Sequence, residues 1–269
     1  MSLRAACGAA RVRCSMSDVP ALETRDLTIR FGGHVAVNAV SCAFRPGTLT
    51  AIVGPNGAGK TTYFNLISGQ LRATAGRVLL NGADVTSLSA SARTRRGMGR
   101  AFQLTNLFPG LTVRENVRVA VQSRLGAGLD LVHSWTRRTD LIAEAEVILE
   151  QVALGARLND LAGALPHGDQ RKLEVAMLMA LKPDIFMFDE PTAGMSVDDV
   201  PTILDLIQAI KARADKTILL VEHKMDVVRS LADRIIVLHN GALVADGKPA
   251  DVIALPVVQE AYLGMAANA

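Results

Sequence analysis

The segment from Gly54 to Thr62 reads Gly-Pro-Asn-Gly-Ala-Gly-Lys-Thr-Thr and matches the pattern G-x-x-x-x-G-K-[ST]. It follows an apolar run of strand length, Leu49–Val53, and leads into a segment, Lys60–Ser68, that is typical of a helix ending before Gly69. A strand, a glycine-rich turn and a helix in this order direct backbone N–H groups and a helix N-terminus at one point. This arrangement predicts an α/β fold that holds a phosphate group.

Each residue type in this loop suits a bound nucleoside triphosphate. The glycines let backbone N–H groups approach phosphate oxygens without a Cβ in the way. Lys60 places a compact positive charge on the β- and γ-phosphates, and the hydroxyl of Thr61 reaches a Mg²⁺ ion. The residues expected to contact the nucleotide here are Gly54, Pro55, Asn56, Gly57, Ala58, Gly59, Lys60, Thr61 and Thr62.

Length and charge exclude several classes of protein. The 269 residues suffice for one large domain, or for a domain with a sizeable subdomain. A net charge of +3, from 29 basic and 26 acidic residues, gives no footprint for nucleic acid. No stretch reaches the roughly 18 apolar residues of a membrane-spanning helix. A local group of arginines is expected to form a solvated helix face: Arg93, Arg95, Arg96 and Arg100.

The first fifteen residues, 1–15, differ from the rest, since they are rich in Arg, Ala and Cys and contain no acidic residue. They fit a disordered tail, a weak targeting segment, or translated sequence upstream of a true start at Met16. The third reading is favoured because patterned sequence begins after Met16, and the domain is then expected to span 16–269. The three cysteines, Cys7, Cys14 and Cys42, lack metal or redox spacing and fit a reducing compartment.

The apolar pattern predicts three successive parts. Short strand-like segments at 22–31, 35–44, 49–53 and 76–85 predict a small, mostly antiparallel sheet beside the nucleotide. From about 88 to 182 the pattern is helical, with a capping box at Thr112–Glu115 and helices over 139–152 and 169–181. Buried strands then alternate with helices, and an Asn240-Gly241 hairpin closes the pattern: strands at 185–188, 218–221 and 234–237, helices at 200–212 and 225–232. These parts predict a mixed sheet with an inserted helical subdomain at about 104–182.

Two acids, Asp189 and Glu190, end a strand that is apolar throughout. Acids there are costly unless they function, and parallel sheets bind ligands at the carboxyl ends of their strands. Asp189 suits the Mg²⁺ shell through water, and Glu190 suits a general base for the attacking water. His223 follows another such strand and suits a sensor of the γ-phosphate, and Gln103 suits a ligand of Mg²⁺ or water. Taken alone, a histidine is more often a surface or packed residue, and the glutamine is equally often an ordinary polar residue.

These motifs, in this order and spacing, resemble an ATP-binding cassette (ABC) ATPase over nearly all of residues 21–264. The resemblance implies a P-loop NTPase fold with a mixed central sheet, an N-terminal antiparallel β subdomain and an inserted α-helical subdomain. It implies ATP and Mg²⁺ as cofactors, with Thr61, Gln103 and Asp189 around the metal. The residues it assigns to the ATP site are Phe31 on adenine, the loop Gly54–Thr62, Lys60, Gln103, the catalytic Glu190 and the switch residue His223. For Phe31, a core position at a strand end remains an alternative.

The signature motif of the family corresponds to Leu165, Pro166, His167, Gly168 and Asp169. In the family this motif faces the ATP of a second subunit, and its serine donates a hydroxyl to the γ-phosphate. Pro166 offers neither a hydroxyl nor a backbone N–H. One reading is a tolerated variant. The other is an asymmetric dimer, in which the site completed by this signature hydrolyses ATP slowly.

Further segments resemble the ATP-binding subunits of branched-chain amino acid importers: Leu107–Asn116, Leu173–Ala176, Ala193–Met195 and Glu260–Gly264. The implied partners are a second ABC ATPase subunit, in a homo- or heterodimer, two integral membrane permease subunits and, indirectly, a periplasmic substrate-binding protein. No nucleic acid is expected. The implied location is peripheral, on the cytoplasmic face of the inner membrane. The apolar patch around Leu104–Leu111 is expected to dock the membrane subunit, with packing inside the helical subdomain as the alternative.

Related importers of amides or urea look much alike, and exporters share every motif named above. A cassette ATPase acting on ribosomes or DNA usually carries two cassettes or a long coiled coil, and the single cassette here has no heptad run. A regulator that does not hydrolyse nucleotide is disfavoured by Glu190 and His223. ATP hydrolysis coupled to import is therefore the favoured function.

Overall fold

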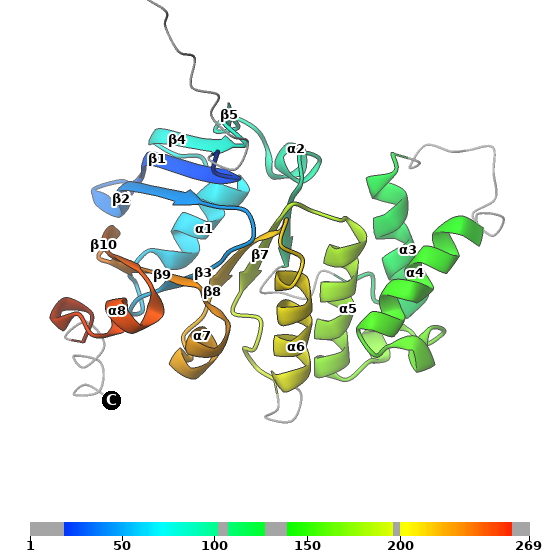
Figure 1. Cartoon of the computed structure of the whole chain (residues 1–269). Coiled ribbons are helices and arrows are strands. Elements are labelled where there is room, and N and C mark those ends of the chain that lie inside the picture. Colours follow the sequence, from blue (N-terminus) through cyan, green and yellow to red (C-terminus); the bar gives the residue numbers. More distant parts are fainter. Residues whose placement is uncertain (1–18, 102–106, 127–138, 196–199, 260–269) are drawn as a thin grey trace, which may run out of the picture.

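The computed structural model describes residues 19–101, 107–126, 139–195 and 200–259 (Figure 1). An antiparallel sheet in the order β2-β1-β4-β5 forms the N-terminal part. Its strands are β1 (Leu22–Phe31), β2 (His34–Phe44), β4 (Ala75–Leu80) and β5 (Ala83–Asp84). Asn81 and Gly82, with φ of 49° and 79°, form the turn between β4 and β5, as the Asn-Gly pair indicates. The predicted antiparallel sheet is confirmed, except that the segment 49–53 belongs to the central sheet, where both of its neighbours are parallel.

The central sheet is mixed, in the order β10-β9-β3-β8-β7-β6. Every pair is parallel except the β9–β10 hairpin. The strands are β3 (Leu49–Val53), β6 (Met98–Ala101), β7 (Ile185–Asp189), β8 (Thr217–Val221), β9 (Arg234–His239) and β10 (Ala242–Gly247). All residues of β3, β7 and β8 are buried, which accounts for sequences that are apolar apart from Thr50, Asp189 and Thr217.

Strand β6 corrects the prediction of continuous helix from residue 88. Only the short α2 (Ala90–Thr94) is helical there, and β6 then pairs with β7. The sequence Met-Gly-Arg-Ala has no strand pattern. Tertiary contacts, and not local propensity, make this segment a strand. A Cβ on Gly99 would lie 2.5 Å from Leu178 Cδ1 of α5 (His167–Ala180) and 2.7 Å from Pro183 Cγ, so a side chain here would displace both neighbours.

The helices lie on both sides of the central sheet. Helix α1 (Lys60–Ser68) lies between the two sheets, and its Tyr63 and Phe64 are buried against both. Helices α3 (Val113–Arg124), α4 (Thr139–Gln151) and α5 form a separate group at the side of the molecule away from the antiparallel sheet (Figure 1). The remaining helices are α6 (Val200–Lys211), α7 (Met225–Leu231) and α8 (Pro249–Ile253), with two short 3-10 turns at Gly155–Arg157 and Ala162–Ala164.

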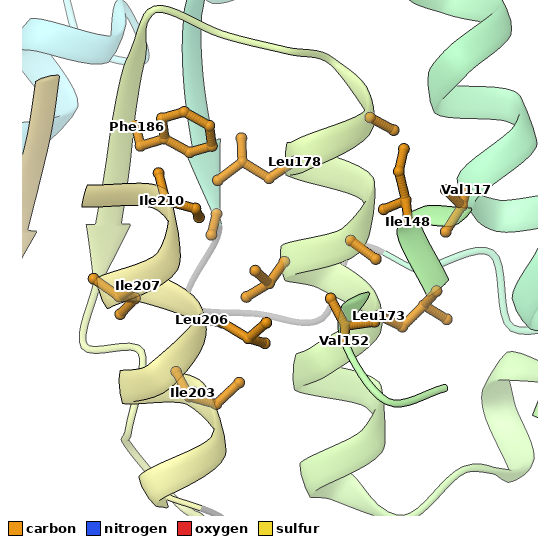
Figure 2. Packing of buried hydrophobic residues seen from close by; sticks show 14 of the residues in the cluster. Val117, Ile148, Val152, Leu173, Leu178, Phe186, Ile203, Leu206, Ile207 and Ile210 are labelled. Carbon is orange, nitrogen blue, oxygen red and sulfur yellow. The ribbon is translucent and has the colours of Figure 1, made fainter. Parts of the chain in front are cut away.

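The largest apolar core joins this helical group to the sheet. Figure 2 shows α5 between its neighbours, with Leu178 directed toward Phe186 and Ile210, and Leu173 toward Val152. Helix α5 contributes buried side chains both toward α3 and α4 and toward the central sheet. It therefore links the helical group to the sheet. The predicted start of this helix at Asp169 is two residues late, since α5 begins at His167.

The arginine group is not the solvated helix face that its sequence predicts. Arg95 and Arg96 are exposed, but Arg93 is 2 % exposed and donates to the carbonyls of Leu66 and Ile67, at 2.8 and 2.6 Å. Its guanidinium thus satisfies carbonyls at the C-terminus of α1, where a cation is favoured. Arg100 is partly exposed as a residue, but its side chain is only 8 % exposed, because it lies in the functional site.

A cluster of ion pairs joins α3, α4 and the segment after α5. Arg124 of α3 donates two hydrogen bonds to Glu144 of α4, at 2.9 and 2.7 Å, and Lys182 reaches the same carboxylate at 2.7 Å. Hydrogen bonding from Arg124 is the main cause that lowers the pKa of Glu144 from 4.5 to about 2.

Glu144→Gln should lower the free energy of unfolding by about 1 kcal/mol near neutral pH, because it removes the charge that both cations contact. A carboxyl with a lowered pKa stabilises the fold above its ordinary pKa, and this stabilisation is lost as the pH falls from 4.5 towards 2. Urea unfolding of both proteins across that range should show curves that converge in acid. Glu146→Gln, which removes one exposed pair with Arg114, is the control and should change little. A pH-independent difference would contradict this account.

Candidate active site

The loop between β3 and α1 has the conformation that its glycines predict. Gly54, Gly57 and Gly59 have φ of 148°, 79° and 94°, which side chains rarely adopt. Gly59 is the N-cap of α1, so the first N–H groups of this helix point to the loop. Helix α1 spans Lys60–Ser68 and ends at Gly69, as predicted.

The loop is held from behind by both sheets. Gly241 N, in the turn between β9 and β10, donates to Ala58 O at 3.0 Å, and Asn38 N of β2 donates to Gly241 O at 2.8 Å. A Cβ on Gly54 would lie 2.1 Å from Leu238 O, and one on Gly59 would lie 2.4 Å from Ala36 O. The glycines therefore serve packing as well as phosphate access.

The Lys60 side chain folds back over this loop. Its Nζ donates to Gly54 O at 2.6 Å and to Pro55 O at 2.8 Å, and the residue is 5 % exposed. Burial lowers the pKa of Lys60, and the carboxylates of Glu190 and Asp189 oppose that shift. The ammonium is thus a partly dehydrated cation facing two acids, which a phosphate ligand would stabilise.

Asp189 is oriented by Arg100, a residue that no sequence motif places at this site. Arg100 Nη2 donates to Asp189 Oδ2 at 2.8 Å, and Nη1 donates to Asn65 Oδ1 and Ser68 Oγ of α1 at 2.6 and 2.9 Å. Burial raises the pKa of Asp189, and Arg100 opposes the rise. One arginine on β6 therefore connects strand β7 to the helix that follows the phosphate loop.

The donor set around Asp189 fits a magnesium ion. Oδ1 of Asp189 is buried and has no hydrogen-bond partner among the described residues, while Oδ2 is occupied by Arg100. Thr61, in the first turn of α1, is exposed on the side of the loop. A carboxylate oxygen and a hydroxyl are the hard oxygen ligands that Mg²⁺ prefers, directly or through water.

Glu190 and His223 contact each other across two loops. His223 Nε2 lies 2.6 Å from Glu190 Oε1, although β7 and β8 deliver them from separate parts of the chain. Glu190 has a left-handed φ of 48°, and its N–H donates to Val221 O at 2.9 Å. A strained, tightly held carboxylate beside an imidazole is typical of a catalytic position.

Arg171 is a second site residue that the sequence analysis missed. It is 5 % exposed on α5 and donates to three consecutive carbonyls, those of Asp189, Glu190 and Pro191, at 3.4, 3.2 and 3.2 Å. Glu174 pairs with the same guanidinium at 2.6 Å. Helix α5 therefore holds the loop that carries Glu190.

The signature residues form the start of α5. Leu165 is buried, Pro166 is the N-cap, and His167 and Gly168 begin the first turn. Asp169 contacts Lys172 and Arg157, at 2.9 and 3.0 Å. Since its carboxylate already has two cations within the chain, the backbone of this turn is the part left for an anion.

Phe31 is the remaining predicted site residue that the structure describes. Phe31 is 50 % exposed at the end of β1, a position that allows a ring to stack on it. Gln103 and the patch residues 104–106 lie outside the described residues. Within the described residues, no helix is long and apolar enough to cross a membrane.

Gly59→Ala should abolish nucleotide binding and lower the melting temperature, because the new Cβ meets Ala36 O at 2.4 Å in a left-handed conformation. Gly110→Ala is the matched control, since that position has open space and an ordinary φ. Calorimetric titration with ATP and thermal unfolding measure both effects. Retained binding by Gly59→Ala would show that the loop tolerates a side chain there.

The comparisons with known proteins agree with this geometry. The family model described as "ABC transporter" matches residues 37–193. The chain is 38% identical over 252 residues to BraF of Pseudomonas aeruginosa and to LivG of Escherichia coli, covering 92% of this chain and 99% of each relative. Both relatives are high-affinity branched-chain amino acid transport ATP-binding proteins.

Among solved structures, the ADP conformation of MJ1267, an ATP-binding cassette of an ABC transporter, superposes with a TM-score of 0.78. It is 28% identical and covers 91% of this chain and 98% of its own. Its match extends over both sheets and the helical group, so the ABC cassette fold is confirmed. The chain belongs to the ABC transporter family and is an ATP-binding subunit that hydrolyses ATP.

Proposed function

We propose that this ATPase powers the uptake of branched-chain amino acids through a membrane transporter. The observation that carries the cargo is the similarity to two such ATP-binding proteins, 38% identical over nearly their entire length. The site geometry carries the hydrolysis: the phosphate loop, Lys60, Asp189 and the Glu190–His223 pair lie at the carboxyl ends of neighbouring strands.

In this proposal each residue has one part in hydrolysis. The loop Gly54–Thr62 and Lys60 bind the phosphates, and Phe31 stacks on adenine. Thr61 and Asp189 hold Mg²⁺, which neutralises the charge that develops on the phosphate oxygens. Glu190 takes the proton of the attacking water, and its contact with His223 positions it for that step. Gln103, outside the described residues, is proposed to contact Mg²⁺ or that water.

The second ATPase subunit completes the site in this proposal. The first turn of α5, with Leu165, Pro166, His167, Gly168 and Asp169, faces the γ-phosphate bound by that subunit. Arg171 supports the idea, because it joins this turn to the carbonyls of residues 189–191. In this proposal, phosphate bound at the turn affects the position of Glu190 through Arg171. In a homodimer of this chain the site that contains Pro166 is present twice, and in a heterodimer it is present once.

A pocket of about 260 Å³ is the proposed docking place of a membrane subunit. Its walls come from β6, α3 and α5, and Phe108, which is 49 % exposed, lies at its edge. The lining is mainly apolar, but Arg100 and Glu174 form part of it. These two residues contact Asp189 and Arg171, so a segment in the pocket lies one contact from the catalytic loop. A peripheral position on the cytoplasmic face of the membrane follows from this docking.

Two substitutions should separate binding from hydrolysis. Lys60→Ala should weaken ATP binding by at least about tenfold, since it removes the phosphate-facing cation. Glu190→Gln should keep ATP affinity while turnover falls by at least about 100-fold, because the amide accepts no proton. Calorimetry and phosphate release measure the two effects. Lys211→Ala and Glu146→Gln, both away from the site, are the controls. Normal turnover in Glu190→Gln would remove Glu190 from the role of base.

The cargo is tested with the assembled transporter in liposomes. Leucine, isoleucine and valine, each with its binding protein, should stimulate ATP hydrolysis and enter the vesicles. Stimulation by short amides or urea alone would assign the chain to a related importer. Export of solute from the vesicles would overturn import. Hydrolysis that ignores every solute and every membrane subunit would refute the transport proposal while leaving the ATPase intact.

A further inference from the structure

Glu222 is a buried carboxylate directly before His223, and none of the roles above uses it. The residue is 3 % exposed at the end of β8. Among the described residues it forms no ion pair. Burying a carboxylate without a countercharge is costly, so its hydrogen bonds must compensate for the lost hydration.

Three donors surround this carboxylate. Thr192 Oγ1 donates to Oε1 at 2.5 Å, and the backbone N–H groups of His223 and Lys224 donate to Oε2 at 2.7 and 3.2 Å. A carboxylate only accepts hydrogen bonds, and here every partner donates. Charge-assisted bonds of this kind are about twice as strong as neutral ones. Glu222 is thus fully engaged inside the protein.

These bonds join the two loops that carry the catalytic pair. Thr192 lies two residues after Glu190 in the loop that follows β7, and it is 1 % exposed. Glu222 lies in the loop that follows β8 and binds the backbone of His223 itself. The contact between His223 and Glu190, at 2.6 Å, closes a ring: Glu190, Thr192, Glu222, His223 and back to Glu190. The left-handed φ of Glu190 is held within this ring.

We propose that Glu222 is a positioning residue for ATP hydrolysis. It fixes the backbone of His223 so that the imidazole meets Glu190, and through Thr192 it fixes the loop that carries Glu190. This inference rests on the roles proposed for Glu190 and His223. Because Glu222 contacts neither the phosphate loop nor Phe31, its loss acts on the rate of hydrolysis and leaves nucleotide affinity unchanged.

The test removes either end of the Thr192–Glu222 contact. Glu222→Ala and Thr192→Val should each lower kcat by about tenfold to 100-fold, the cost of a catalytic group misplaced by about 1 Å. KM for ATP should stay within about twofold. Glu222→Gln and Thr192→Ser should recover most of the loss, because the amide oxygen still accepts the two N–H bonds and serine still offers a hydroxyl. Should Glu222→Ala fail to fold, Thr192→Val alone carries the test.

Thr217→Val is the matched control. Thr217 is a buried threonine at the other end of β8, and its hydroxyl donates to Arg45 O at 3.3 Å. Its loss removes one buried hydrogen bond far from Glu190 and should leave kcat unchanged. An equal loss of kcat in Thr217→Val and Thr192→Val would overturn the proposal, since the effect would then be one of general stability.

A double substitution distinguishes this inference from the function on which it rests. Because Glu222 acts through His223, adding Glu222→Ala to His223→Ala should slow hydrolysis no further. Additive losses would mean an independent structural effect and would overturn the positioning role. Wild-type turnover in His223→Ala refutes the role proposed for His223. Slow turnover in His223→Ala, with wild-type turnover in Glu222→Ala and Thr192→Val, refutes the inference about Glu222 alone.

Discussion

Three fully buried parallel strands, β3, β7 and β8, end side by side, and the charged groups of the site lie at that edge. The strand register places the ends of the three strands next to one another. Asp189 of β7 pairs with Val221 of β8, and Ile52 of β3 pairs with the same residue. The phosphate loop, the two acids and the switch loop therefore emerge at one height. Since water is excluded from the strands, each charge at this edge needs a partner from a neighbouring element.

Arginines from elements outside the three strands supply many of those partners. Arg100 on β6 pairs with Asp189, and Arg171 on α5 holds the carbonyls of residues 189–191. Both guanidiniums are largely buried, and both join different elements to one loop. Planar, forked donors suit this task, because one side chain satisfies several acceptors in fixed directions. Electrostatic order at the site is thus built by the helical group and the edge strand as much as by the motifs.

The sequence predicts well what local patterns determine. Buried strands, the glycine loop, the capping box at Thr112 and the Asn240-Gly241 turn were all recognised, because each rests on residues close in the chain. Strand β6 and the burial of Arg93 and Arg100 were missed, because contacts with α1, α5 and β7 determine them. Glu222 was missed for the same reason: an acid before a histidine has no local signature, and Thr192 lies thirty residues away. The domain limits and the roles of the site residues stay predictions.

The contacts of the turn at Gly241 limit the order in which parts of the domain can fold during synthesis. The phosphate loop is complete in sequence by residue 62, yet the backbone that supports it from behind includes Gly241 and Leu238. On the ribosome, a nascent chain therefore carries the nucleotide motif through most of its synthesis without the contact that shapes it. Strand β3 likewise waits for β8 and β9 on either side. The contacts that shape the phosphate loop can therefore form only after β9 and the turn at Gly241 have been synthesised.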